Sequence, residues 1–295
     1  MIVVKLMGGL GNQMFQYAIG RSLAEKINTE LKLDLSFLLD RTPRPHFTYR
    51  NYELAIFNIQ ESFSTTQEVD IFIDKAQEPL ARLIQWMNKL IVDRKVVKER
   101  GFYFDPGVFN LTGHLYLEGY WQSEKYFKNI EKIIRQEFTF KCEPDLSNRQ
   151  LLNKIESVEA VSVHIRRGDY VSDTITNQFH GVCGLEYYQQ AIEKIAQEVH
   201  EPHFYIFSDN IDWAKKNIQL NFPTTYVTHN PPDKGYEDLR LMSHCKHHII
   251  ANSSFSWWAA WLNSNPEKIV IAPEKWFADI TIDTTDLIPE GWIRI

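Results

Sequence analysis

The second half of the chain alternates short apolar segments with segments of helical periodicity. Each apolar run is rich in β-branched or aromatic residues, and in each intervening segment the apolar residues recur every three or four positions. Strands separated in this way by helices are typical of a parallel, doubly wound sheet. The predicted strands are 160–165, 203–207, 224–227, 248–251 and 269–271, and the predicted helices are 185–199, 211–218, 236–242 and 255–262.

The first half opens in the same manner and then becomes less regular. Its predicted elements are strand 2–6, helix 13–27, strand 30–35, helix 79–90, strand 114–120 and helix 124–137. Residues 141–148 carry Cys, Pro, Asp, Ser and Asn without periodicity, which indicates a linker. A chain of 295 residues also exceeds what one hydrophobic core usually supports. We therefore predict two α/β domains, residues 1–145 and 146–295.

Composition excludes several classes of protein. With 38 acidic and 32 basic residues, the net charge of −6 gives no overall attraction to nucleic acid or to an anionic membrane. The three cysteines form no C-x-x-C pair, which predicts reduced thiols in the cytoplasm. No apolar run approaches the ~20 residues that span a bilayer, and the first strand leaves no room for an export signal.

The opening loop "MGGLGNQ" lies between a strand and a helix, where dinucleotide-binding proteins carry G-x-G-x-x-G. Gly9 and Gly11 match this fingerprint, but the third glycine is missing. Asp34 could serve as a ribose carboxylate, which keeps a nicotinamide enzyme as a secondary interpretation. Asn12 and Gln13 fit another use better, because amides at a helix start can bind sugar hydroxyls or a diphosphate.

The strand at 160–165 runs into "RRGDY", which places polar side chains at its carboxyl end. Open α/β sheets bind ligands at that edge, so His164, Arg166 and Asp169 are candidate site residues. Adjacent residues on an extended segment point in opposite directions. We expect one of Arg166 and Arg167 to offer its planar guanidinium to a phosphate and the other to pair with Asp169 or another carboxylate. The alternative is a solvated surface turn.

Two further strand ends carry polar residues. Asp209 could accept paired hydrogen bonds from a guanine, whereas for Asn210 a guanine contact and a helix cap are equally favoured. Asn252, Ser253 and Ser254 precede a helix whose free N–H groups and positive dipole end could seat a phosphate.

The sequence gives little support for a metal site. His244 and His248 have the i, i+4 spacing of a metal pair, but a strand begins within that segment and no carboxylate accompanies them. The chain has no Asp-x-Asp, the acidic pair that holds a divalent cation on many sugar nucleotides. Trp257 and Trp261 share a helix face and are assigned to packing. We therefore predict no metal and no bound cofactor.

Four segments in this order, "GGLGNQMFQYA", "HIRRGDY", "FSDN" and "NSSFSWWAAWL", resemble the bacterial α-1,2-fucosyltransferases of glycosyltransferase family 11. The resemblance covers nearly the whole chain. It implies a GT-B-like fold, with two Rossmann-like domains facing a cleft. It also implies GDP-fucose as donor, inversion at the anomeric carbon and no requirement for a metal.

The resemblance also implies roles for individual residues. Arg166 would hold the β-phosphate, His164 and the Asp209–Asn210 edge would contact guanine, and Asn12 would face the fucose or diphosphate. Ser253 and Ser254 would contact phosphate, and relatives commonly carry Asp where this chain has Asn210.

Three residues near the motifs are candidates for the general base, namely Asp173, His180 and Asp34. His180 has the pKa range best suited to neutral pH. The expected acceptor is a galactose-terminated oligosaccharide or lipid-linked glycan, modified in the cytoplasm, with peripheral association at the inner face of the membrane left open. A non-catalytic sugar-nucleotide or glycan-binding protein is the main alternative, and a nicotinamide-dependent oxidoreductase ranks third.

Overall fold

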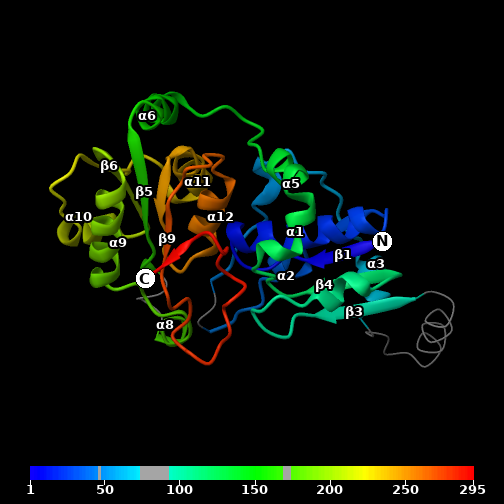
Figure 1. The fold of residues 1–295 in the computed structure, drawn as a ribbon. Coiled ribbons are helices and arrows are strands. Elements are labelled where there is room, and N and C mark those ends of the chain that lie inside the picture. Colours follow the sequence, from blue (N-terminus) through cyan, green and yellow to red (C-terminus); the bar gives the residue numbers. More distant parts are fainter. Residues whose placement is uncertain (46–47, 74–92, 169–173) are drawn as a thin grey trace. The chain divides into compact units, whose positions relative to one another are not determined.

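A computed structural model describes residues 1–45, 48–73, 93–168 and 174–295. The predicted helix at 79–90 and the candidates Asp169 and Asp173 lie outside these ranges. The chain divides into two compact units (Figure 1). Unit 1 contains residues 1–141 and 283–287, and unit 2 contains residues 142–282 and 288–295. The sequence-based boundary at residue 145 neighbours this division, but the return of 283–287 to unit 1 was not predicted.

Unit 1 is built on a parallel four-stranded sheet with the order β2-β1-β4-β3. Its long first helix has thirteen buried residues among seventeen, which explains why it shows no clear amphipathic stripe. The strands are β1 (Ile2–Lys5), β2 (Leu31–Asp34), β3 (Arg94–Lys98) and β4 (His114–Glu118). The α-helices are α1 (Leu10–Lys26), α2 (Ser36–Leu39), α3 (Thr66–Asp70) and α5 (Glu131–Glu137), and the 3-10 helices are η1 (Leu54–Ile56), η2 (Pro106–Asn110), η3 (Glu124–Tyr126) and η4 (Lys128–Ile130).

The prediction of one continuous helix at 124–137 was wrong. The segment breaks into η3, η4 and α5, because Phe127 takes a non-helical backbone conformation with φ of −138°. The Phe127 ring is fully buried and packs 6.2 Å from that of Phe15. Burial of this aromatic ring therefore outweighs the helical periodicity of the segment.

Unit 2 contains a parallel six-stranded sheet with the order β10-β9-β8-β5-β6-β7. Its strands are β5 (Glu159–Ile165), β6 (Pro202–Ser208), β7 (Thr224–Tyr226), β8 (His247–Ile249), β9 (Val270–Ala272) and β10 (Ile293–Arg294). Its helices are α6 (Leu146–Glu156), α8 (Thr174–His180), α9 (Leu185–Glu198), α10 (Ile211–Asn217), η5 (Pro232–Lys234), α11 (Gly235–His244) and α12 (Ser254–Leu262). The doubly wound sheet predicted for this half is confirmed, and α6, α8 and β10 are additions.

The strand order of unit 2 reverses direction at β5. From β5 the chain moves outward to β6 and β7, and it then returns to place β8 on the other side of β5. Figure 1 shows α9 and α10 on one side of β5, with α11 and α12 on the other. Val161, Val163 and Ile165 pack in one apolar cluster with residues of α9. In open α/β sheets, ligands bind at such a reversal, beyond the carboxyl ends of the two diverging strands, which here are β5 and β8.

Candidate functional site

The carboxyl ends of β5 and β6 are joined by the carboxylate of Asp209. Its Oδ2 lies 2.8 Å from Nη1 of Arg166, and its Oδ1 accepts a 2.8 Å hydrogen bond from the backbone N–H of Arg167. Gly168 leaves room for this carboxylate, because a Cβ there would lie 2.7 Å from Asp209 Oδ2 and one of the two would have to shift. The structure thus brings Arg166 and Asp209 together, as strand-end reasoning predicts. Of the two adjacent arginines, the one that makes this ion pair is Arg166, to which the resemblance assigns the β-phosphate.

His164 lies at the end of β5 with its ring buried. The ring packs 5.6 Å from that of Phe255, and its Nδ1 has no hydrogen-bond partner among the described residues. Burial lowers the pKa of His164, although Asp209 opposes this shift. The imidazole is therefore neutral near pH 7 and can offer one donor and one acceptor to a ligand.

The side chain of Arg167 lies over an aromatic ring that sequence reasoning missed. Its guanidinium carbon is 4.0 Å from the ring centroid of Trp213, in a cation–π arrangement, and its Nε has no partner among the described residues. Trp213 stands in the first turn of α10, and its N–H donates 3.1 Å to Oδ1 of Asn210. Asn210 is thus the N-cap of α10, so the capping alternative holds in this structure.

Asn252 follows β8 and holds neighbouring segments together. Its Nδ2 donates to the backbone oxygens of His180 at 2.9 Å and Trp276 at 3.2 Å, and its Oδ1 lies 3.4 Å from the thiol of Cys183. The side chain is 3% exposed. All its polar atoms are occupied within the protein, so Asn252 positions this edge of unit 2 and is a poor ligand contact.

Ser253 and Ser254 follow Asn252 and stand at the N-terminus of α12. Ser253 is the N-cap of α12, yet its side chain makes no capping hydrogen bond. Ser254 is the first helical residue and is half-buried. Because the dipole of a helix is positive at its N-terminus, an anion would be stabilised at this end of α12.

His180 ends α8 and is half-buried between aromatic rings. Its ring centroid lies 4.9 Å from that of Phe179 and 5.7 Å from that of Phe277. Its carbonyl accepts from Asn252, which links this histidine to the end of β8. The structure therefore places His180 beside the same edge of unit 2 as Asn252.

The side chain of Gln13, in the opening loop of unit 1, hydrogen-bonds to backbone groups of the protein. Gln13 is fully buried, and its amide donates to the backbone oxygens of Gly8 at 2.9 Å and Asn51 at 2.8 Å. Its Oε1 accepts from the N–H of Glu53 at 2.9 Å, and the Glu53 carboxylate in turn accepts from the N–H of Leu10. Gln13 therefore cannot face a ligand without breaking the loop, and Asn12, which is half-buried, is the amide of this pair that reaches the surface.

Asp34 is removed from the list of candidate bases. Its side chain is 2% exposed and accepts hydrogen bonds from the Tyr116 hydroxyl at 2.6 Å and from Ser36 at 2.8 and 3.0 Å. A carboxylate with these partners is available neither to a sugar hydroxyl nor to a nucleotide ribose. Asp34 therefore does not serve as the ribose carboxylate that the secondary nicotinamide interpretation requires.

The histidines at 244 and 248 face different partners. Nδ1 of His244 contacts the carbonyl of Arg240 at 2.8 Å, whereas Nδ1 of His248 contacts the Ser162 hydroxyl at 2.9 Å. His248 belongs to β8, so helical spacing does not apply to it. Within the described ranges, no group of three or more His, Cys, Asp or Glu side chains could hold a metal ion.

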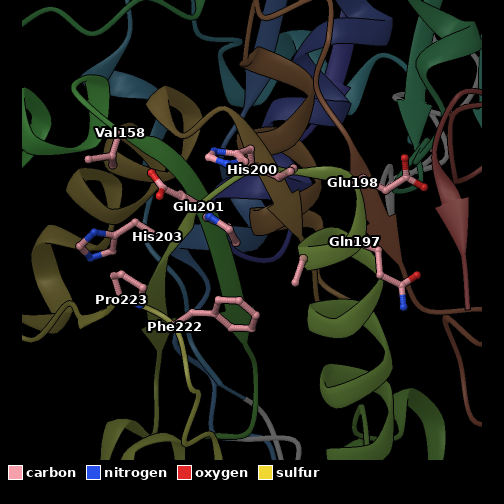
Figure 2. A pocket seen from close by; sticks show the side chains of 11 residues that line it. Val158, Gln197, Glu198, His200, Glu201, His203, Phe222 and Pro223 are labelled. Atoms are coloured by element: carbon pink, nitrogen blue, oxygen red, sulfur yellow. The ribbon is translucent and has the colours of Figure 1, made fainter.

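A pocket of about 740 Å³ lies at the opposite edge of the unit 2 sheet. Figure 2 shows Val158, Glu201, His203 and Phe222 around it. Val158 precedes β5 and Glu201 precedes β6, so the pocket is at the amino-terminal ends of these strands. The strand ends that carry Arg166 lie at the other edge, and the pocket is therefore not the candidate site.

Comparison with known proteins identifies the family. The sequence profile of Glycosyl transferase family 11 matches residues 1–295. The chain belongs to this family. It is accordingly a glycosyltransferase, and this excludes the oxidoreductase alternative. No helix among the described residues is long and apolar enough to cross a membrane.

Individual relatives cover most or all of the chain. It is 36% identical to an alpha-1,2-colitosyltransferase of Escherichia coli, over 100% of this chain and 98% of that protein. It is 27% identical to the galactoside 2-alpha-L-fucosyltransferase SEC1 of Bos taurus, over 86% of this chain and 62% of that protein. A mutant of Arabidopsis thaliana FUT1 in complex with GDP matches with a TM-score of 0.51 and 12% identity, over 93% of this chain and 71% of that chain. With the parallel α/β sheets of both units, this match supports the predicted GT-B-like fold.

Proposed function

We propose that this glycosyltransferase moves L-fucose from GDP-β-L-fucose to the 2-hydroxyl of a terminal galactose, with inversion and without a metal. The observation that carries the proposal is the cluster at the carboxyl end of β5, where Arg166 is paired with Asp209 beside buried His164. This edge adjoins the strand-order reversal, where doubly wound sheets bind nucleotides. The name of the bovine relative, a galactoside 2-alpha-L-fucosyltransferase, supports the same reaction.

In the proposed mechanism, the galactose hydroxyl attacks the anomeric carbon as GDP leaves. Negative charge grows on the β-phosphate, and the guanidinium of Arg166 is suited to stabilise it. The proposed phosphate contacts also include Ser253 and Ser254, because they stand at the positive end of the α12 dipole. Neutral His164 and the carboxylate of Asp209 are the proposed guanine contacts. A single displacement of a β-linked leaving group gives an α-linked fucose.

The acceptor hydroxyl must lose its proton during this displacement. Among the candidate bases, Asp34 is engaged with Tyr116 and Ser36, and Asp173 lies outside the described residues. We therefore propose His180, whose half-buried ring neighbours the end of β8 through the contact of its carbonyl with Asn252.

GDP-colitose is a second candidate for the sugar donor, and one observation favours it. The E. coli relative that is 36% identical over the whole chain is named a colitosyltransferase. Colitose is L-fucose without its 3-hydroxyl group, so the two donors differ by one polar group on the transferred sugar. A site that hydrogen-bonds this hydroxyl would reject the deoxy sugar, whereas an apolar site would discriminate weakly.

The decisive experiment supplies the purified protein with GDP-fucose or GDP-colitose and a panel of galactosides, and measures GDP release and product. Proton NMR then reports the anomeric configuration through its coupling and the linkage through a contact between fucose H1 and galactose H2. A β-fucoside would defeat the displacement mechanism, and an α-fucoside on another hydroxyl would remove only the regiochemical claim. Nucleotide binding with neither transfer nor slow donor hydrolysis would favour the non-catalytic alternative.

A further inference from the structure

Phe179 exposes an aromatic ring on the surface of unit 2. It is the last residue but one of α8 and is 42% exposed. The centroid of its ring lies 5.0 Å from that of Phe277, which is 4% exposed. Part of the Phe179 ring is therefore packed against a buried neighbour, and the remainder faces solvent. Single exposed apolar side chains are common on protein surfaces, so the case for a ligand depends on how and where this ring is held.

The backbone that carries Phe179 is held by hydrogen bonds from two segments. The N–H of Ala278 donates to the carbonyl of Phe179 at 3.0 Å, and the N–H of Gly181 donates to the carbonyl of Asn177 at 2.8 Å. Gly181 has a φ of +66°, a conformation that favours glycine, and a Cβ there would lie 3.5 Å from Cβ of Ala278. The chain thus leaves α8 in close contact with the segment around residue 278, which fixes the direction of the Phe179 ring.

Asn252 joins both segments to the end of β8. Its Nδ2 donates to the carbonyls of His180 at 2.9 Å and of Trp276 at 3.2 Å. Asn252 directly precedes the start of α12, where the proposed phosphate contacts lie, and β8 is one of the two strands that diverge at the strand-order reversal. Figure 1 shows α8 at the end of unit 2 where β5 finishes. The Phe179 ring is therefore held beside the edge of the sheet at which doubly wound folds bind nucleotides.

We propose that Phe179 binds the sugar of the GDP-sugar donor by stacking its ring on the apolar face of that sugar. The inference rests on the proposed function, in which the diphosphate lies at the start of α12. In L-fucose, the axial 4-hydroxyl leaves the C–H groups of C3, C4 and C5 on the opposite face, and C6 is a methyl group. An aromatic ring removes these groups from water, and its negative face attracts their hydrogens. Colitose keeps this face, so the ring fits either sugar and discriminates weakly between them.

The test compares the binding of GDP-fucose with that of GDP, which lacks the sugar. Titration calorimetry without an acceptor gives both Kd values for wild type and for Phe179→Ala. In the variant, the Kd for GDP-fucose should rise about tenfold, whereas the Kd for GDP should stay within about twofold of wild type. Phe179→Tyr and Phe179→Trp keep a flat ring and should bind GDP-fucose as wild type does. Phe179→Leu keeps apolar bulk without a flat face and should give an intermediate loss.

Phe222 offers a matched control in the same unit. It is 38% exposed, and its ring centroid lies 5.6 Å from that of the fully buried Phe204. It lines the pocket at the amino-terminal edge of the sheet, away from the proposed site. Phe222→Ala removes the same ring from a similar surface position and should leave both Kd values unchanged. Thermal unfolding identifies variants that fail to fold, and if Phe179→Ala is one of them, the comparison of Phe179→Leu with Phe179→Tyr takes its place.

Equal losses of affinity for GDP and GDP-fucose would overturn the inference, because Phe179 would then act through the fold. An unchanged Kd for GDP-fucose would also overturn it, as would a loss confined to the KM of the acceptor. Failure of the proposed function is a different result, because it appears in the wild-type protein as an absence of fucose transfer. A wild-type protein that uses GDP-colitose would fail as a fucosyltransferase, yet Phe179→Ala should still weaken the binding of GDP-colitose and not that of GDP.

Discussion

Replacing Arg166 with alanine should separate catalysis from stability. Its Nη1 is 2.8 Å from Asp209 Oδ2, and each of the two side chains is 24% exposed. An ion pair with this access to water contributes roughly 0–1 kcal/mol to folding. Asp209 also keeps its hydrogen bond from the N–H of Arg167 in the variant. We therefore expect folded Arg166→Ala protein, with a free energy of unfolding reduced by at most about 1 kcal/mol.

The expected effect on transfer is much larger. If the guanidinium of Arg166 stabilises the charge that grows on the β-phosphate, its removal should cost about 3 kcal/mol in the transition state, or a hundredfold to thousandfold in kcat. Initial rates at saturating GDP-fucose and acceptor measure kcat, and thermal unfolding of the same samples measures stability. Arg166→Lys is the matched variant, because it keeps the charge and loses the planar fork.

Arg166→Ala protein that is folded and has a kcat within a few-fold of wild type would refute this assignment. A loss of activity that tracks unfolding would also refute the separation of roles, because the residue would then act through the fold.

Other predictions test the surroundings of this pair. Gly168→Ala should lower transfer more than about tenfold with little change in Tm, because its Cβ would displace the carboxylate of Asp209; normal kinetics would show that the carboxylate need not stay in place. Arg167→Ala should lower Tm by removing the guanidinium from the ring of Trp213, as measured by calorimetry. Transfer should survive EDTA, and complete loss restored by manganese or zinc would count against the proposed mechanism. Burial raises the pKa of Asp238 to about 6, so folding favours the protonated carboxyl group. The stability contributed by this carboxyl group is therefore fully present below pH ~4 and is lost as the pH rises to about 6. Asp238→Asn should raise Tm at pH ~8 and not at pH ~4.

The sheet of unit 2 could be predicted because its strands are buried on both faces. Such strands read as continuous apolar runs, and the segments between them carry clear helical periodicity. Helix α6 was missed because its capping signal was interpreted as a linker. Asp145 is the N-cap and accepts 3.0 Å from the N–H of Asn148, so the polar residues around 145 begin a helix. Leu146 is 71% exposed and weakens the periodicity further.

The candidate residues could be predicted from the strand ends, but the direction in which each side-chain amide points could not be predicted. Asn12, Gln13 and Asn252 are equivalent in the sequence, since each is an amide next to a glycine loop or a strand end. In the structure, the side-chain amides of Gln13 and Asn252 hydrogen-bond to backbone groups of distant segments. Whether an amide faces a ligand depends on which distant carbonyls approach it, and sequence spacing carries no information on that.

Glu99 shows the same limit more sharply, because its hydrogen bonds follow from strand register. Its carboxylate accepts from the N–H groups of Tyr120 at 2.6 Å and Trp121 at 2.8 Å, and Trp121 has a left-handed φ of +56°. β3 pairs with β4 so that Lys98 is opposite Glu118, which places Glu99 beside Gly119 and within reach of the next two N–H groups. From the sequence, Glu99 is one of several charged residues in a polar stretch, and nothing fixes its partner. A shift of one residue in this register would turn Glu99 to the opposite face of the sheet and leave Trp121 without its support. The backbone conformation of Trp121 is therefore supported by a pairing of strands, which the residues around Trp121 do not encode.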